Sequence, residues 1–275
     1  MRLKAWRTGL ALALVSGFGV MPALAQAVPY HADPSARDIV PAASAVPAIR
    51  FLTTADFPPF NFRDSTGALI GFNVDLAKAI CEEAKAACTI QAWPWEMAAD
   101  ALADNQGDAL IAGLDMSAAN GALFDFSAVY IALPGRFVTR LPDATTFNPD
   151  KLAGKTVAVR RGTAHAAFMA RYLPDVTLAP YDTELDALAA VETNQADAFF
   201  GDAMRASFWL NEHLDCCSFA GDAYFRPRQF GEGLSVAVPA GSEAMRHVID
   251  WALVRLKDNG VLDELYLRWF PVGFY

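Results

Sequence analysis

The side chains best suited to bind a small charged molecule lie directly after the predicted strands of this 275-residue chain. Carboxylates occur there at Asp56, Asp115 and Asp202, and Phe57, inside the stretch DFPPF, adds a flat apolar face. Ligands of open parallel sheets bind beyond the carboxyl ends of the strands, so these side chains are expected to face one site. Carboxylates at such a site favour a ligand with an ammonium group.

Alternating strands and helices would position these residues, and the alternation occurs twice. Strands that alternate with helices predict parallel sheets, and two such runs predict two α/β lobes with a cleft between them. An apolar stripe near the carboxyl end, from Trp251 to Trp269 with a stop at Asn259 and Gly260, predicts helices that pack on the first lobe. The predicted strands are 49–54, 88–92, 108–112, 155–160, 176–179 and 197–200, and the predicted helices between them are 73–84, 96–104, 164–172 and 183–193.

An internal echo supports the two-lobe prediction. Residues 102–113 (LADNQGDALIAG) and 191–202 (VETNQADAFFGD) share the pattern Asn-Gln-x-Asp-Ala, in each case where a helix ends and a buried strand follows. A match of five positions can also arise by chance, because α/β units converge on similar local patterns.

The amino terminus has the pattern of a secretory signal peptide. Arg2, Lys4 and Arg7 precede an apolar run at 9–20 and the small-residue stretch 23–25, and the run is shorter than the ~20 residues of a membrane-spanning helix. We expect cleavage after Ala25, a disordered Ala- and Pro-rich leader at 26–48, and a periplasmic mature protein.

Charge and motif content exclude several functions. The chain has 22 basic and 31 acidic residues, which argues against a nucleic acid or an anionic membrane as partner. The 4 histidines are scattered, and no stretch has the spacing of a nucleophile elbow, a phosphate loop or a metal site. We therefore expect no metal and no cofactor.

Cys81 and Cys88 can form a disulfide only if the predicted helix ends between them. Seven residues of unbroken helix span ~10.5 Å, beyond the ~7 Å between the Cα atoms of a disulfide. A bridge suits an exported protein, and two free buried thiols are the alternative. Cys216 and Cys217 receive no assigned role.

From Ile49 onward the chain resembles the periplasmic solute-binding proteins of polar amino acid ABC transporters, family 3. The resemblance implies the type II periplasmic-binding-protein fold, in which two α/β lobes with mostly parallel sheets are joined by two hinge crossings. Lobe one would comprise 49–132 plus 235–275 and lobe two 133–234. It also implies a monomer that captures a ligand by hinge closure and docks on a membrane permease. The matching stretches are FLTTADFPPFNF, GALIGFNVDLAKAIC, ALADNQGDALIAG, FDFSAVY, LAGKTVAVRRGT, ADAFFGDA, SVAVPAG and LVRLKDNGVLDELYLRWF.

The resemblance also implies roles for individual residues. Asp202 matches the aspartate that binds the ligand's α-ammonium group, and Phe57 matches the aromatic residue that covers the ligand's side chain. Trp95 matches a second apolar wall, and Thr54 stands where relatives that bind cationic side chains place an acid. At the helix start that meets the carboxylate, the matching residues are Gly162, Thr163 and His165, the last in place of a frequent amide.

The loop 113–121 (GLDMSAANG) departs from the family pattern. Asn120 stands where the family places an arginine that grips the ligand's carboxylate, and Asp115 stands where a small hydroxyl residue is common. An amide cannot imitate a guanidinium fork, and a nearby aspartate repels a carboxylate. Two explanations follow. Either the ligand is an amine held by Asp115 and Asp202, or Arg161 of lobe two grips the carboxylate instead of lying in solvent.

Two other functions stay open at this point. The same fold includes cyclohexadienyl dehydratases, for which Glu232 and Asp115 would be the candidate general acids, although the anionic substrate conflicts with the loss of a basic anchor. The protein could instead serve a sensor or a dehydrogenase as its binding module. We expect a binding protein for a small amine-bearing solute and no enzyme activity.

Overall fold

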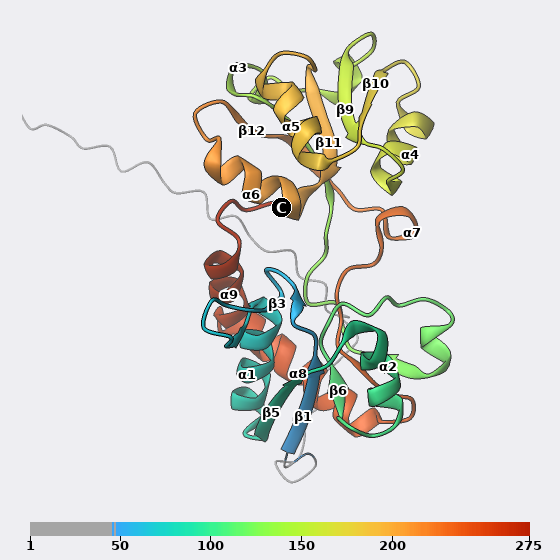
Figure 1. The fold of residues 1–275 in the computed structure, drawn as a ribbon, viewed down its shortest axis with the longest axis vertical. Helices are drawn as coiled ribbons and strands as arrows, with labels where there is room; N and C mark the ends of the chain where they lie inside the picture. Colours follow the sequence, from blue (N-terminus) through green and yellow to red (C-terminus); the bar gives the residue numbers. More distant parts are fainter. Residues whose placement is uncertain (1–45, 47) are drawn as a thin grey trace, which may run out of the picture.

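The computed structural model of the chain describes residue 46 and residues 48–275, which form two lobes (Figure 1). The predicted signal peptide and nearly all of the predicted leader lie outside the described residues. Within the described part of the chain, no helix is long and apolar enough to cross a membrane.

Lobe one is built on a five-stranded sheet with the order β5-β1-β6-β13-β7. Strand β1 runs parallel to β5 and β6, whereas β13 runs antiparallel to β6 and β7. Four helices flank this sheet, among them the carboxyl-terminal pair α8 and α9 that the apolar stripe predicts (Figure 1). The elements are β1 (Ala48–Thr53), α1 (Phe72–Ala84), β5 (Ala87–Ala92), α2 (Trp95–Ala103), β6 (Ala109–Leu110), β7 (Phe124–Phe126), β13 (Ala237–Pro239), α8 (Glu243–Asp258) and α9 (Val261–Trp269).

Lobe two repeats this plan with a five-stranded sheet of order β10-β9-β11-β8-β12. Strand β9 pairs in parallel with β10 and β11, and β8 pairs antiparallel with β11 and β12. The elements are β8 (Gly135–Arg140), α3 (Leu141–Ala144), η2 (Pro149–Lys151), β9 (Thr156–Arg160), α4 (Ala164–Tyr172), β10 (Thr177–Tyr181), α5 (Glu184–Glu192), β11 (Ala198–Asp202), α6 (Ala203–Glu212) and β12 (Cys217–Tyr224).

The two α/β lobes are confirmed, and so are the parallel strand pairs made by the alternating segments. The sequence prediction lacked the antiparallel strands, which make both sheets mixed. These strands, β7, β8, β12 and β13, flank the segments that cross between lobes and do not belong to strand–helix–strand units, so the alternation did not reveal them. The remaining short elements are the three-stranded sheet β2 (Asp56–Phe57), β3 (Asn61–Arg63) and β4 (Leu69–Ile70), the turn η1 (Asn120–Ala122) and α7 (Pro227–Phe230).

The internal echo corresponds to the same local structure in both lobes. Asn105 and Asn194, just past α2 and α5, have φ of 58° and 61°, a left-handed conformation that asparagine tolerates well. The aspartates three residues later, Asp108 and Asp197, each accept a backbone N–H from the neighbouring strand at 2.8 Å. The shared pattern therefore ends a helix and fastens the next strand to its partner.

The disulfide between Cys81 and Cys88 is confirmed, with a Cα–Cα distance of 5.9 Å. Helix α1 ends at Ala84, between the two cysteines, as the distance argument requires. Cys216 and Cys217, at the start of β12, are also joined to each other, so no cysteine among the described residues is free.

Two segments cross between the lobes, one before β8 and one after β12. They pair where they meet: Tyr130 N–H donates to the carbonyl of Leu234 at 2.9 Å, and Leu234 N–H donates to the carbonyl of Ile131 at 2.8 Å. Paired crossings of this kind form a hinge that lets two rigid lobes rotate.

The carboxyl-terminal tail forms a third contact between the lobes, because it leaves α9 and ends beside lobe two (Figure 1). Val272 packs against the hydrophobic core of lobe two, and the Phe274 carbonyl accepts a hydrogen bond from Arg136 of β8 at 3.3 Å. The hydroxyl of Tyr275 lies on the first crossing, where it donates to the carbonyl of Ala132 at 2.9 Å and accepts from its N–H at 3.2 Å. The tail therefore braces the hinge.

Replacing Tyr275 by Phe is expected to destabilise the protein by about 1 to 3 kcal/mol, because both polar groups of the Ala132 backbone lose their partner. Urea unfolding followed by circular dichroism measures this change. Tyr172→Phe is the matched control, because Tyr172 is exposed and its expected effect is within about 0.5 kcal/mol. Equal effects of the two substitutions would contradict a bracing role.

Candidate functional site

A cavity of about 540 Å³ lies between the lobes, and residues of both lobes line it. Lobe one contributes the β2 hairpin, and lobe two contributes the carboxyl end of β9 and the amino-terminal parts of α5 and α6. This position agrees with the rule that ligands of open α/β sheets bind at strand ends. The lining residues are Asp56, Phe57, Pro58, Pro59, Arg160, Thr183, Glu184, Leu185, Leu188, Met204, Arg205 and Phe208.

The wall from lobe one is largely apolar. The Phe57 ring stacks on Phe60, with ring centroids 4.8 Å apart. A Cβ atom on Gly113 would lie 3.0 Å from Cε1 of Phe57, so the glycine, with φ of +82°, lets the ring pack against the loop 113–121. Phe57 is therefore the predicted contact residue that the structure places in the cavity wall.

Thr54 does not face the cavity, because it is buried in a polar network of lobe one. Its hydroxyl accepts from Nδ2 of Asn61 at 2.8 Å, and Oδ1 of Asn61 accepts from Nδ2 of Asn73. Tyr130 of the first crossing donates to Oδ1 of Asn73 at 2.8 Å. The acid nearest in sequence that lines the cavity is Asp56.

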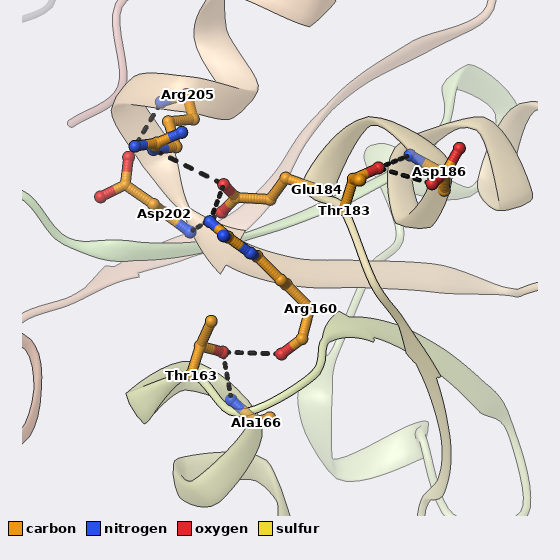
Figure 2. A network of polar contacts seen from close by, with 8 residues as sticks. All are labelled: Arg160, Thr163, Ala166, Thr183, Glu184, Asp186, Asp202 and Arg205. Atoms are coloured by element: carbon orange, nitrogen blue, oxygen red, sulfur yellow. Dashed lines mark hydrogen bonds and ion pairs between the residues drawn. The ribbon is translucent and has the colours of Figure 1, made fainter.

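The wall from lobe two is charged (Figure 2). Glu184, the first residue of α5, lies between two guanidinium groups: its Oε2 is 3.9 Å from Nη1 of Arg160 and 3.6 Å from Nε of Arg205. Its other oxygen, Oε1, accepts from the backbone N–H of Asp202 at 3.4 Å. The Glu184 side chain is 11% exposed, whereas those of Arg160 and Arg205 are 43% and 60% exposed.

Local capping interactions position these side chains. Thr183 caps α5, because its hydroxyl accepts from Asp186 N–H at 3.1 Å, and this places Glu184 at the first helical position. Asp202 caps α6 by accepting from Arg205 N–H at 2.9 Å. Asp202 does not line the cavity, but its backbone N–H contacts Glu184 and its carboxylate accepts from the Arg205 N–H, and both of those residues line it (Figure 2).

The two acids of this wall have raised pKa values. Burial raises the pKa of Asp202. Burial also raises the pKa of Glu184, and the negative charge of Asp202 raises it further, whereas the positive charges of Arg205 and Arg160 act in the opposite direction. Buried carboxylates of this kind gain from a nearby cation, because a cation offsets the cost of ionising them.

The loop 113–121 is held by hydrogen bonds between its own residues. Nδ2 of Asn120 donates to Oδ1 of Asp115 at 2.8 Å and to the Asp115 carbonyl at 2.9 Å. Ser117 accepts a weaker bond from Asn120 N–H at 3.3 Å. The Asn120 amide thus supplies a hydrogen-bond donor to the Asp115 carboxylate, and neither residue lines the cavity.

Arg161 points to the surface of lobe two, where its Nε lies 3.0 Å from Oδ1 of Asp182, and both side chains are exposed. Gly162, with φ of +74°, follows it, and Thr163 caps α4 by accepting from Ala166 N–H at 3.2 Å. Neither Arg161 nor this helix start lines the cavity.

His165 and Trp95 also lie outside the cavity lining. The His165 ring stacks on Phe230 of α7, with centroids 4.4 Å apart, so it packs on the second crossing. Burial lowers its pKa to about 4, which keeps it neutral. Trp95 begins α2 and is 44% exposed.

Sequence reasoning missed Arg160, Glu184 and Arg205. The sequence predicts a helix that starts at Thr183 after a strand, so the acid that follows Thr183 is expected at the strand ends as well. Arg160 is the last residue of β9 and Arg161 follows it directly, and neighbouring side chains of an extended chain point to opposite faces. Only the three-dimensional arrangement shows which of the two faces the cleft.

Comparison with known proteins agrees with the geometry. Residues 49–272 match the family model of bacterial extracellular solute-binding proteins, family 3. A putative ABC transporter arginine-binding protein 2 of Escherichia coli is 31% identical, and the match covers 83% of this chain and 93% of the relative.

Two solved structures share the fold. One is the unliganded open L-cystine solute receptor of Neisseria gonorrhoeae, with a TM-score of 0.73, 20% identity, and coverage of 82% of this chain and 94% of that one. The other is an ancestral cyclohexadienyl dehydratase, with a TM-score of 0.69, 21% identity, and coverage of 82% and 93%. The extent of the family match decides the assignment: the chain belongs to the bacterial extracellular solute-binding proteins, family 3.

Proposed function

We propose that this protein is the periplasmic substrate-binding component of an ABC importer and captures an amino acid or a related amine by closure of its two lobes. The observation that carries the proposal is the cavity of about 540 Å³ whose walls come from both lobes. Closure about the paired crossings would bring the Phe57 wall onto the charged wall and enclose a ligand. The protein would act as a monomer that delivers the ligand to a membrane permease.

The charge of the site favours a ligand with at least one ammonium or guanidinium group. Asp56 and Glu184 line the cavity, and Asp202 contacts Glu184 through its backbone N–H. Against these three acids stand Arg160 and Arg205. These five side chains together carry one net negative charge (three acids minus two arginines), so an amino acid with one net positive charge would neutralise them. The similarity to an arginine-binding protein by name supports the same ligand class.

Within this proposal Asp202 and Glu184 together attract the ligand's positive end. Both acids are held at a cost in the empty protein, as their raised pKa values show. A bound ammonium group would lower that cost, and this difference between empty and occupied states contributes to affinity.

A dehydratase is a weaker candidate. Its general acids would need raised pKa values, which burial supplies. Glu232 and Asp115, the two candidates, are exposed, and Asp115 accepts hydrogen bonds from its own loop. A binding module for a sensor would capture its ligand by the same geometry and differs only in the partner of the closed form.

Ligand capture is tested by thermal unfolding of urea-stripped, refolded protein with amino acids, polyamines and quaternary amines. A ligand at 100 times its Kd is expected to add ~2.7 kcal/mol of stability. Asp202→Asn is expected to weaken binding of the best ligand by about 10- to 100-fold, because the ligand's positive end loses the attraction of a carboxylate charge that adjoins two lining residues. Stabilisation by no member of the panel would refute amino acid capture.

The same substitution is expected to stabilise the empty protein at pH 7 by on the order of 1 kcal/mol. Asparagine keeps the cap on α6 and carries no charge to bury. A carboxyl group whose pKa is raised by folding destabilises the folded state above that pKa and does not do so below its unfolded pKa of about 3.9. The gain should therefore shrink as the pH falls through the raised pKa of Asp202.

Urea unfolding at a series of pH values measures this gain. Asp175→Asn serves as the control, because Asp175 is an exposed residue of lobe two whose change is expected to be within about 0.5 kcal/mol at every pH. A loss of stability in Asp202→Asn at pH 7 would show that the Asp202 carboxylate supports the fold instead of straining it.

A further inference from the structure

Arg160 and Arg205 present more hydrogen-bond donors than the protein uses. Each guanidinium has five N–H groups in a planar fork. Their recorded side-chain contact is one oxygen of Glu184, at 3.9 Å and 3.6 Å, and both distances exceed hydrogen-bond range. Within residues 46 and 48–275 neither guanidinium reaches another acceptor. Both side chains line the cavity and are 43% and 60% exposed, so these donors are accessible to a ligand.

These two arginines are the cationic residues of the cavity lining. They come from different elements, the end of β9 and the first turn of α6, and Glu184 holds them on either side of one carboxylate (Figure 2). Both guanidinium groups share this one acid on the cavity surface, so their remaining N–H donors are available to a second anionic group. A second carboxylate fits this arrangement, because planar guanidinium forks match carboxylate oxygens in geometry and charge.

We propose that Arg160 and Arg205 of lobe two bind the carboxylate of the ligand, in place of the arginine that Asn120 of lobe one replaces. This inference rests on the proposed capture of an amino acid. Lobe one has no cation in the cavity lining, where its charged residue is Asp56. The ligand's ammonium group then meets the Glu184 and Asp202 acids a few ångströms away, so both ends of the amino acid are recognised mainly by lobe two.

The arrangement distinguishes Arg160 from its neighbour Arg161. Arg161 has an acceptor of its own in Asp182, at 3.0 Å on the outer surface, and a weaker contact to the Pro180 carbonyl at 3.3 Å. Arg160 has no hydrogen-bond acceptor for its side chain among the described residues, and it lines the cavity. A carboxylate in the cleft would therefore find the donors of Arg160 available.

The test compares each amino acid with the amine that lacks only its α-carboxylate, by isothermal titration calorimetry of urea-stripped, refolded protein. The probes are L-arginine with agmatine, L-ornithine with putrescine, and L-histidine with histamine. Wild-type protein is expected to bind the amino acid of the best pair about 10- to 100-fold more tightly than its amine. In the double variant Arg160→Gln/Arg205→Gln this ratio should fall to about 3 or less, through loss of amino acid affinity alone.

Matched variants separate the explanations. Arg171→Gln, an exposed arginine of α4, should leave both affinities unchanged. Arg160→Lys and Arg205→Lys keep the charge but lose the fork, so each should keep part of the preference for the amino acid. Circular dichroism and the melting temperature show whether each variant is folded. If the double variant does not fold, the single lysine variants still test the proposal, because each keeps a cation beside Glu184.

Several results would overturn the proposal. An equal loss of amino acid and amine binding in the double variant would show that the arginines only position Glu184. If Asp56→Asn caused the same equal loss of binding, the arginines would act through an ion pair with Asp56 across the closed cleft. If Arg161→Gln alone removed the preference for the amino acid over its amine, Arg161 would be the residue that binds the carboxylate. Binding of no amino acid at all would refute the proposed function itself, whereas equal wild-type affinity for acid and amine would refute only the carboxylate site.

Discussion

The burial of the Glu184 and Asp202 carboxylates beside Arg160 and Arg205 is the interaction on which the binding surface depends. Two acids so close together raise the cost of ionisation, and the arginines offset only part of it. The wall is therefore charged, partly dry and incompletely paired, which is unfavourable for the empty protein and favourable for a zwitterionic or cationic guest. Under the proposed function, ligand affinity and the cost of the empty state would share one electrostatic origin at this site.

This arrangement suits a two-lobed molecule. The charged wall belongs almost entirely to lobe two, and the wall from lobe one consists of the Phe57 ring and its two prolines, with Asp56 at its edge. Under the proposed function, lobe two would bind the ligand's polar end while lobe one closes over it and excludes water. Removal of water strengthens every charge interaction inside the cleft, so closure and recognition reinforce each other.

The carboxyl-terminal tail constrains the hinge in addition to the two crossings. The crossings pair through Tyr130, Ile131 and Leu234, and the carboxyl-terminal tail adds Tyr275 to the same region. Tyr130 also joins the Asn61–Asn73 network that holds Thr54 beneath the Phe57 hairpin. Residues that pack the hinge are therefore continuous with those that support the ligand wall of lobe one.

Much of the architecture was predictable from local patterns. Helix α4 begins and ends at the predicted residues, α1 ends between its two cysteines, and the Asn-Gln-x-Asp-Ala echo marks the same helix-to-strand joint twice. In each case the physical cause is local: a cap, a left-handed asparagine, or a period of apolar residues, all of which a short window of sequence contains. The antiparallel strands beside the crossings were missed because their partners are far away in the chain.

The sequence by itself determined the two α/β lobes and the helix end between Cys81 and Cys88 that a bridge requires, since these depend on residue identity and short-range periodicity. Only the tertiary structure decided which charges face the cleft. Arg160 and Arg161 are chemically identical neighbours, and the pleat of β9 together with the position of α5 sends one toward Glu184 and the other toward Asp182. Side-chain direction at a strand end depends on what packs beside it, and that information lies in residues distant in sequence.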